Sequence, residues 1–319
     1  AYITKRWGTA HDIQPTLSRF LQFMGVGLLL LGFGTLLLGW TYADTHNGRW
    51  SFSLYELVQL QFVSKDIIGT LIFFSLFYGL GIRIPVFPLH GWLPSFMSDG
   101  NTAVAPIYLL GLKVGIYGML RFVFPIVPEA VQEWHVIATI FAGSGVFYAA
   151  FLAMRQHTLR DMLAFAVISH TGILTIGMFS LHPMGFKGSI LLALNFGIAI
   201  AGLALMTGMV WQRTRTTRMD KLGGMLDYIP IVGLAFLVAG LAIVGMPGTP
   251  GFDAVHFVLE GSIKRFGALV TIAMALGNLV AASFLLKAFQ KAFFGQAPAG
   301  TSHWATRPTS PAATFMASI

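Results

Sequence analysis

Residues 66–94 read DIIGTLIFFSLFYGLGIRIPVFPLHGWLP, an apolar run that is interrupted by one positive charge and by prolines. Proline removes a backbone donor and clashes with the preceding helical turn, so we expect a helix break near Pro85 and Pro88. A charge at bilayer depth is costly and usually faces a polar interior or a water path. Arg83 therefore indicates either part of an ion or proton path or a helix end from which its side chain snorkels to the membrane interface.

The composition of the 319-residue chain is typical of a membrane protein. Of its residues 55% are hydrophobic and only 10% are charged, whereas a soluble domain carries about 25% charged residues. The absence of cysteine excludes disulfides and thiolate metal sites. The net charge of +8 comes from basic residues in short loops, which indicates a topology signal rather than a nucleic-acid partner. We expect no cofactor and no metal site.

The hydropathy pattern predicts an all-α membrane bundle, because each span of a bilayer needs about 20 mostly apolar residues. We predict eight spans, at residues 18–42, 66–94, 103–127, 136–154, 159–181, 184–211, 228–262 and 266–294. Residues 1–7 resemble the tail of an earlier helix, and residues 308–319 stop as apolar residues return. We therefore expect residues 1–319 to be a single membrane-domain fragment of a longer protein.

The loop charges predict an orientation in the membrane. One side holds Lys5, Arg6, Arg19, Arg155, Arg160, Arg213, Arg215, Arg218, Lys221, Lys291 and Arg307. The other side holds Arg49, Lys65, Lys187, Lys264 and Arg265. Because cytoplasmic loops carry an excess of Lys and Arg, both ends of this chain are predicted to lie in the cytoplasm.

A second helix break is predicted in the seventh span, where residues 245–251 read GMPGTPG and contain Pro247, Gly248 and Pro250. The breaks lie in the second and the seventh span, which are five steps apart along the chain. Because this number is odd, the two broken segments run in opposite directions. Two antiparallel broken helices are typical of inverted-repeat transporters. The alternative is an ordinary loop between two short helices.

Two ionisable residues lie within otherwise apolar spans. Lys113 lies near the middle of the third span, where a desolvated lysine can gain and lose a proton near neutrality. The alternative is a static pair with an acid on a neighbouring helix. His170 could relay protons, or it could be a histidine that is hydrogen-bonded between packed helices.

A third polar group follows the second break. Asp253, His256 and Glu260 are spaced by three and four residues, so they share one helical face. This face suits a proton exit. The alternative is a half-helix near the membrane surface with its polar face in water.

These residues resemble the proton-conducting antiporter family, in particular the M-type subunits of bacterial respiratory complex I. The family also contains the large subunits of Mrp-type sodium/proton antiporters. The resemblance covers nearly the whole chain and is most specific in PLHGWLP (88–94), LKVGIYGMLRF (112–122), SHTG (169–172) and MPGT (246–249). It implies a fold of about fourteen helices with inverted repeats, each containing one broken helix.

The resemblance also implies a proton path along a buried axis of Lys, His and Glu, which this chain matches only in part. The central lysine of the family aligns with Lys113, and its first axis histidine aligns with His170. The lysine at the first break aligns with Arg83. The second axis histidine aligns with Phe196, and the glutamate of the second broken helix aligns with Val255.

The departures change the expected chemistry. Arginine does not release a proton in a protein, so Arg83 could respond to an acid's charge but could not carry a proton. Phe196 and Val255 cannot titrate, so Asp253 or His256 would have to act in place of the glutamate. Asn195 could order a water beside Phe196.

The resemblance implies a non-catalytic, proton-translocating subunit of a complex I type assembly in a bacterial inner membrane, with other membrane subunits and the lipid bilayer as partners. A second reading keeps the fold. In this second reading the chain is the proton-conducting membrane subunit of an inorganic carbon uptake complex, with a soluble carbonic-anhydrase-like subunit as its partner. A third reading is a membrane scaffold without ion flux.

Overall fold

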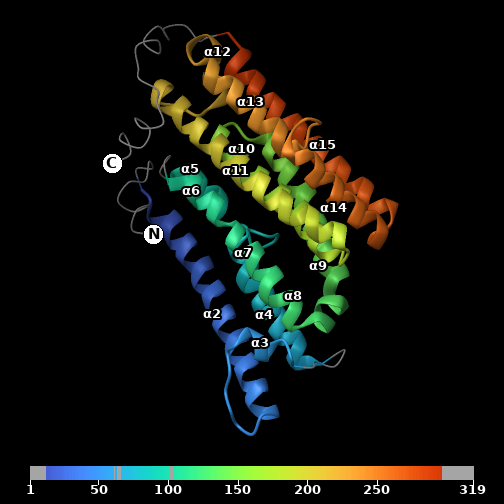
Figure 1. Cartoon of the computed structure of the whole chain (residues 1–319). Helices are drawn as coiled ribbons and strands as arrows, with labels where there is room; N and C mark the ends of the chain where they lie inside the picture. The colour runs from blue at the N-terminus through green and yellow to red at the C-terminus, as the bar shows by residue number, and fades with distance from the viewer. Residues whose placement is uncertain (1–11, 61, 63–65, 101–103, 297–319) are drawn as a thin grey trace.

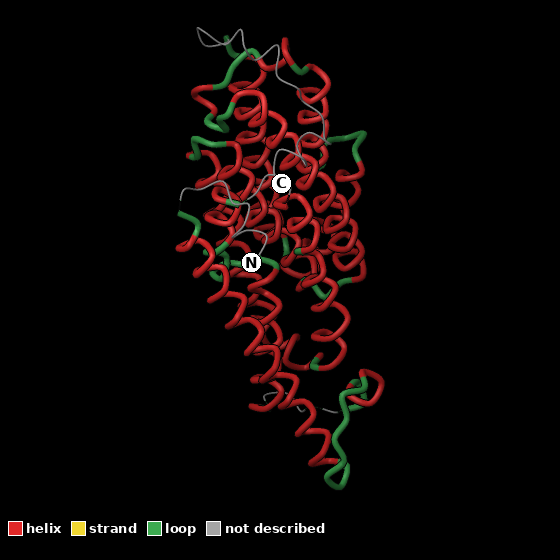
Figure 2. The backbone as a smooth tube through the Cα atoms, turned by 90° about the vertical axis from the view of Figure 1, so that its left-hand side faces the viewer, coloured by secondary structure: helices red, strands yellow, loops and turns green. Residues whose placement is uncertain are grey.

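The computed structural model describes residues 12–60, 62, 66–100 and 104–296. Within these ranges the chain consists of helices joined by loops, and no strand is formed (Figure 2). The predictions made for residues 1–7, Lys65 and residues 307–319 lie outside the described residues. The all-α fold class is confirmed.

Helices occupy all eight predicted ranges. The long ones are α2 (Gln14–Thr45), α4 (Ile67–Arg83), α9 (Pro128–Arg155), α10 (Leu159–Phe179), α11 (Pro183–Thr214), α13 (Pro230–Val244), α14 (Pro250–Phe266) and α15 (Ala268–Phe289). Shorter helices are α3 (Leu54–Leu57), α5 (Leu93–Asp99), α6 (Val104–Gly111), α7 (Lys113–Gly118), α8 (Phe124–Ile126) and α12 (Met225–Tyr228).

Local sequence explains where several helices start. A proline lies in the first turn of α2, α9, α11, α13 and α14, where its missing N–H costs no helical hydrogen bond. Asp66 precedes α4 and accepts hydrogen bonds from the Ile68 and Gly69 amides at 3.1 and 3.2 Å. These residues set the boundaries of the spans.

Five of the described helices are long and apolar enough to cross a membrane, and α4 and α13 are shorter apolar helices. The chain is thus a multi-pass membrane protein. Two predicted boundaries need correction. Helix α9 begins at Pro128 rather than at residue 136, because its first turns carry polar residues that lower the hydropathy. The range 103–127 is not one helix, because it is interrupted at Leu112 and contains a π-helical segment at Met119–Val123.

Both predicted helix breaks are confirmed. The first separates α4 from α5, and the second separates α13 from α14. In Figure 1 the chain rises through α4 to α5 and descends through α13 to α14, so the two broken helices are antiparallel. At the second break, Gly245 and Gly248 have φ angles of +74° and +89°, which glycine adopts without steric cost.

Helix α10 lies at the centre of the bundle. All but two of its residues are buried, and it packs against α5, α9, α11, α14 and α15. Close approach is possible because glycines lie at the contacts. A Cβ atom on Gly172 would lie 2.6 Å from the Ala142 carbonyl oxygen of α9. Small residues at helix contacts are typical of membrane bundles.

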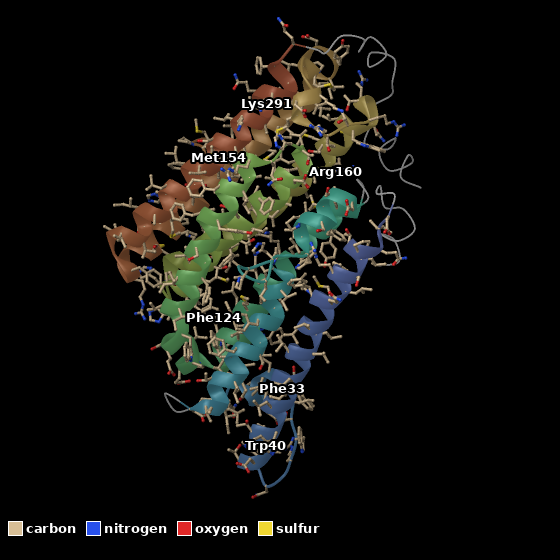
Figure 3. The ribbon with its side chains drawn as sticks, turned by 180° about the vertical axis from the view of Figure 1, so that it is seen from behind. Phe33, Trp40, Phe124, Met154, Arg160 and Lys291 are labelled. Atoms are coloured by element: carbon tan, nitrogen blue, oxygen red, sulfur yellow. The ribbon has the colours of Figure 1, made fainter. Side chains whose placement is uncertain are left out.

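The charged helix ends fall into two groups. Arg160 and Lys291 lie toward the end of the bundle opposite to Trp40 (Figure 3). Helix α9 ends and α10 begins at the Arg160 end, where the loop after α11 also lies (Figure 1). Arg160 and Lys291, which the sequence assigned to the same side, thus lie at the same end of the bundle.

Candidate functional site

Lys113 is the first residue of α7, directly after the interruption at Leu112. Its ammonium nitrogen lies 4.5 Å from the centre of the Phe196 ring of α11. Phe196 is 1% exposed. The ammonium group is therefore turned toward the protein and is stabilised by the electron-rich face of an aromatic ring.

His170 of α10 lies against the same ring. Its imidazole stacks on Phe196 with ring centres 4.8 Å apart and an angle of 7° between the planes. The three side chains come from α7, α10 and α11, and we call them the Lys113–Phe196–His170 cluster. The sequence pointed to Lys113 and His170 as site residues. The structure brings both against Phe196, the residue that the sequence analysis expected to be unable to titrate.

The hydrogen bonding of His170 distinguishes its two ring nitrogens. The Nδ1 atom lies 3.2 Å from the Ala166 carbonyl oxygen, so the neutral ring carries its proton on Nδ1. The Nε2 atom is buried and has no hydrogen-bond partner among the described residues. The ring lies near the Ile243 backbone at the end of α13. In the neutral ring with its proton on Nδ1, Nε2 keeps its lone pair and can accept a proton.

A groove beside Lys113 opens to the surface of the described chain. It has a volume of about 360 Å³ and is lined by Lys113, Tyr117, Arg121, Leu194 and neighbouring apolar residues. Lys113 itself is half-buried. The lysine side chain thus has the buried Phe196 ring on one side and open space on the other.

Two asparagines hold the end of α13 at the second break. The Asn195 Nδ2 atom donates a 2.9 Å hydrogen bond to the Ala242 carbonyl, and the Asn278 Nδ2 atom donates a 2.6 Å hydrogen bond to the Val244 carbonyl. The last carbonyls of a helix lack intrahelical partners. The Asn278 bond supplies such a partner at Val244, and the Asn195 bond adds a second donor to the Ala242 carbonyl, which also accepts a 3.3 Å bond from the Gly245 amide. Sequence reasoning expected Asn195 to order a water and overlooked Asn278. A lone asparagine in an apolar span was the available signal.

At the first break, Arg83 is the last residue of α4 and is exposed in the described chain. It makes no ion pair within the described residues and lies close enough to the Tyr108 hydroxyl to interact electrostatically. Pro85 and Pro88 lie in the segment between α4 and α5. Trp92 bridges this segment, because its Nε1 atom donates a 2.9 Å hydrogen bond to the Ile82 carbonyl.

His90 is a further buried imidazole at the first break, and sequence reasoning did not single it out as a site residue. It is 8% exposed and stacks on Phe87 with ring centres 5.5 Å apart. Tyr148 of α9 lies 5.3 Å from it, measured between ring centres.

The predicted polar face of α14 is present, but it lies on the outside of the described bundle. Asp253 and His256 are exposed, and Glu260 forms a 2.6 Å salt bridge with Lys264. Val255 is buried instead. Within the described residues, these three polar groups make no contact with the Lys113–Phe196–His170 cluster. The same part of the chain contains no group of His, Asp and Glu that could hold a metal ion.

Comparison with known proteins fits this geometry. Residues 20–281 match the family model described as NADH:quinone oxidoreductase/Mrp antiporter, TM. The NADH-quinone oxidoreductase subunit M of Rickettsia conorii is 30% identical over 293 residues, which cover 91% of this chain and 57% of that protein. The F(420)H(2) dehydrogenase subunit M of Methanosarcina mazei is 29% identical and is covered to 59% of its length. The chain thus spans somewhat more than half the length of these relatives.

Solved structures share the fold. A chain in the structure of respiratory complex I from Thermus thermophilus with bound NADH matches with a TM-score of 0.83 and 26% identity, covering 99% of this chain and 66% of that chain. A chain of the Mrp complex from Dietzia sp. DQ12-45-1b matches with a TM-score of 0.80 at 20% identity, which shows the fold alone. The family match over most of the chain leads to one conclusion: this protein belongs to the NADH:quinone oxidoreductase/Mrp antiporter membrane family.

Proposed function

We propose that this chain moves protons across the membrane as an antiporter-like subunit of a complex I type assembly. The observation that carries the proposal is the placement of Lys113 and His170 against one buried ring inside an apolar bundle. Burying ionisable groups at this depth is costly, and a passive scaffold gains nothing that would offset this cost. Two such groups in one cluster therefore favour ion translocation over the scaffold reading.

The cluster supports a simple transfer step. The Lys113 ammonium gives up a proton, and the Nε2 atom of His170 accepts it, with a water as carrier where the two nitrogens are too far apart. This leaves a neutral amine on α7 and an imidazolium on α10. The His170 ring lies near the Ile243 backbone, so the charge on His170 would be felt at the end of α13. Arg83 would act as a fixed counter-charge, because arginine keeps its proton.

The assembly and the orientation are part of the proposal. The relatives described above carry the names of respiratory and antiporter complexes, which favours other membrane subunits as partners. This supports the complex I type assembly over inorganic carbon uptake with a carbonic-anhydrase-like subunit. We place the chain in a bacterial inner membrane with the Arg160 end of the bundle in the cytoplasm, because basic residues are concentrated at that end.

The test is proton flux into vesicles that contain the full-length protein with its native partners. Lys113→Ala should lower flux by roughly 10²-fold, the scale on which a positioned proton-transfer group acts, while assembly stays intact. Val114→Ala is the matched control, because Val114 is the next residue on α7 and is 59% exposed. Unchanged flux in the Lys113 variant would overturn the proposal.

A further inference from the structure

Phe196 is the least expected member of the cluster, because its side chain has no N–H or O–H group and cannot relay a proton. Yet its ring contacts both titratable partners, with its centre 4.5 Å from the Lys113 ammonium and 4.8 Å from the His170 ring centre. The ring is 1% exposed, so its position is fixed by packing. A residue that touches both ends of a proposed transfer and cannot take part in it can control the transfer.

The ring also favours one state of its neighbour. An ammonium group over the face of an aromatic ring is held electrostatically, and the attraction is stronger away from water. While Lys113 stays charged, the Phe196 ring therefore holds it in place. A neutral amine has no such attraction to the ring face. The groove beside Lys113 gives the side chain room to leave the ring.

We propose that Phe196 gates proton transfer between Lys113 and His170. This inference rests on the proposed function. In the closed arrangement the Lys113 ammonium sits on the ring, and the ring keeps water out of the space between the two nitrogens. Transfer follows when the lysine side chain leaves the ring: an N–H bond of the ammonium breaks, and an N–H bond forms at His170 Nε2. Phe196 is a positioning residue in this scheme, and it exchanges no proton itself.

Three substitutions separate the gate from a packing role. Phe196→Leu keeps an apolar side chain but removes the ring face. We expect about a fivefold rise in flux, the change equivalent to losing about 1 kcal/mol of cation–π attraction. Phe196→His supplies a ring that can relay a proton, and it should raise flux at least as much. Phe196→Tyr keeps the ring face and should behave like the parent.

The readout is the pH profile of proton flux in vesicles with the assembled complex. A loosened bundle would not move the profile, whereas removing the hold on the Lys113 charge should shift it in the Leu and His variants. Phe236→Leu is the matched control for losing a buried phenylalanine, because Phe236 is also 1% exposed and packs on Phe289 and Phe293. If the complex with Phe196→Leu fails to assemble, then the flux and the pH profile of Phe196→His test the gate.

The possible results separate the gate from the proposed function. Parental flux and an unchanged profile in both the Leu and His variants, with Lys113→Ala still inactive, would overturn the gate alone. If Lys113→Ala is also fully active, then the proposed function fails as well. A rise in flux with a shifted profile in either variant supports the gate.

Discussion

Asn195 of α11 donates a 2.9 Å hydrogen bond to the Ala242 carbonyl of α13, and this bond ties the end of a broken helix to its neighbour. Asn195 precedes Phe196, so the same turn of α11 holds the second break and contributes the ring of the cluster. A change at either position will therefore be felt at the other. This arrangement links the unwound backbone to the candidate site.

Asn195→Ala should destabilise the second break. The substitution removes the asparagine donor, while the Ala242 carbonyl keeps the 3.3 Å bond from the Gly245 amide. The free energy of unfolding should therefore fall by about 0.5–1.5 kcal/mol, the net contribution of one hydrogen bond. Denaturant unfolding of the purified protein in detergent measures the effect. Ile198→Ala on the exposed side of α11 is the control, because Ile198 is 68% exposed. Equal unfolding of Asn195→Ala and its parent would show that the bond does not stabilise the break.

Gly251→Ala should disturb the same break by crowding. A Cβ atom on Gly251 would lie 2.0 Å from the Ala242 carbonyl oxygen and 2.8 Å from Asn195 Nδ2. The contact with backbone can be relieved only by moving α14 away from α13, at a cost of about 1–3 kcal/mol in stability. Thermal unfolding in detergent is the measurement.

The control for this substitution is Gly240→Ala, since a Cβ atom there meets nothing within 4 Å. Gly240 lies inside α13, so alanine should stabilise the helix slightly, by about 0.5–1 kcal/mol. If Gly251→Ala is as stable as Gly240→Ala, then the two halves of the broken helix are not held as closely as described.

Arg83 should work as a fixed charge. It is exposed and makes no ion pair within the described residues, so we expect a carboxylate from outside these residues to pair with it. Arg83→Lys keeps the charge, and proton flux should hold or rise. Arg83→Met should leave the expected carboxylate without its partner and impair flux, because an unpaired charge at membrane depth is costly. Flux and assembly of both variants are the measurements. Parental behaviour of Arg83→Met would identify Arg83 as an interface residue only.

The spans and both breaks could be predicted from the sequence because hydropathy and proline act locally. Lys113 and His170 stood out for a similar reason, since an ionisable residue in an apolar span is conspicuous. Their meeting on Phe196 could not be predicted, because it depends on how α7, α10 and α11 pack.

Other features could not be predicted either, because they also depend on how the helices pack. The roles of Asn195 and Asn278 require knowing which helix ends at their side chains. The face that carries Asp253 and His256 was predicted from spacing, but spacing does not say which side of α14 faces the bundle. Packing puts Val255 inside.

The most direct test of proton exchange at Lys113 is the flux of the Lys113→Arg variant in vesicles that contain the assembled complex. Arginine keeps a positive charge that can lie over the Phe196 ring, but it does not release a proton. If Lys113 must gain and lose a proton, then flux in Lys113→Arg should fall as far as in Lys113→Ala, by roughly 10²-fold. Flux at the parental level would show that a fixed charge is sufficient there, and it would contradict the proposed transfer from Lys113 to His170.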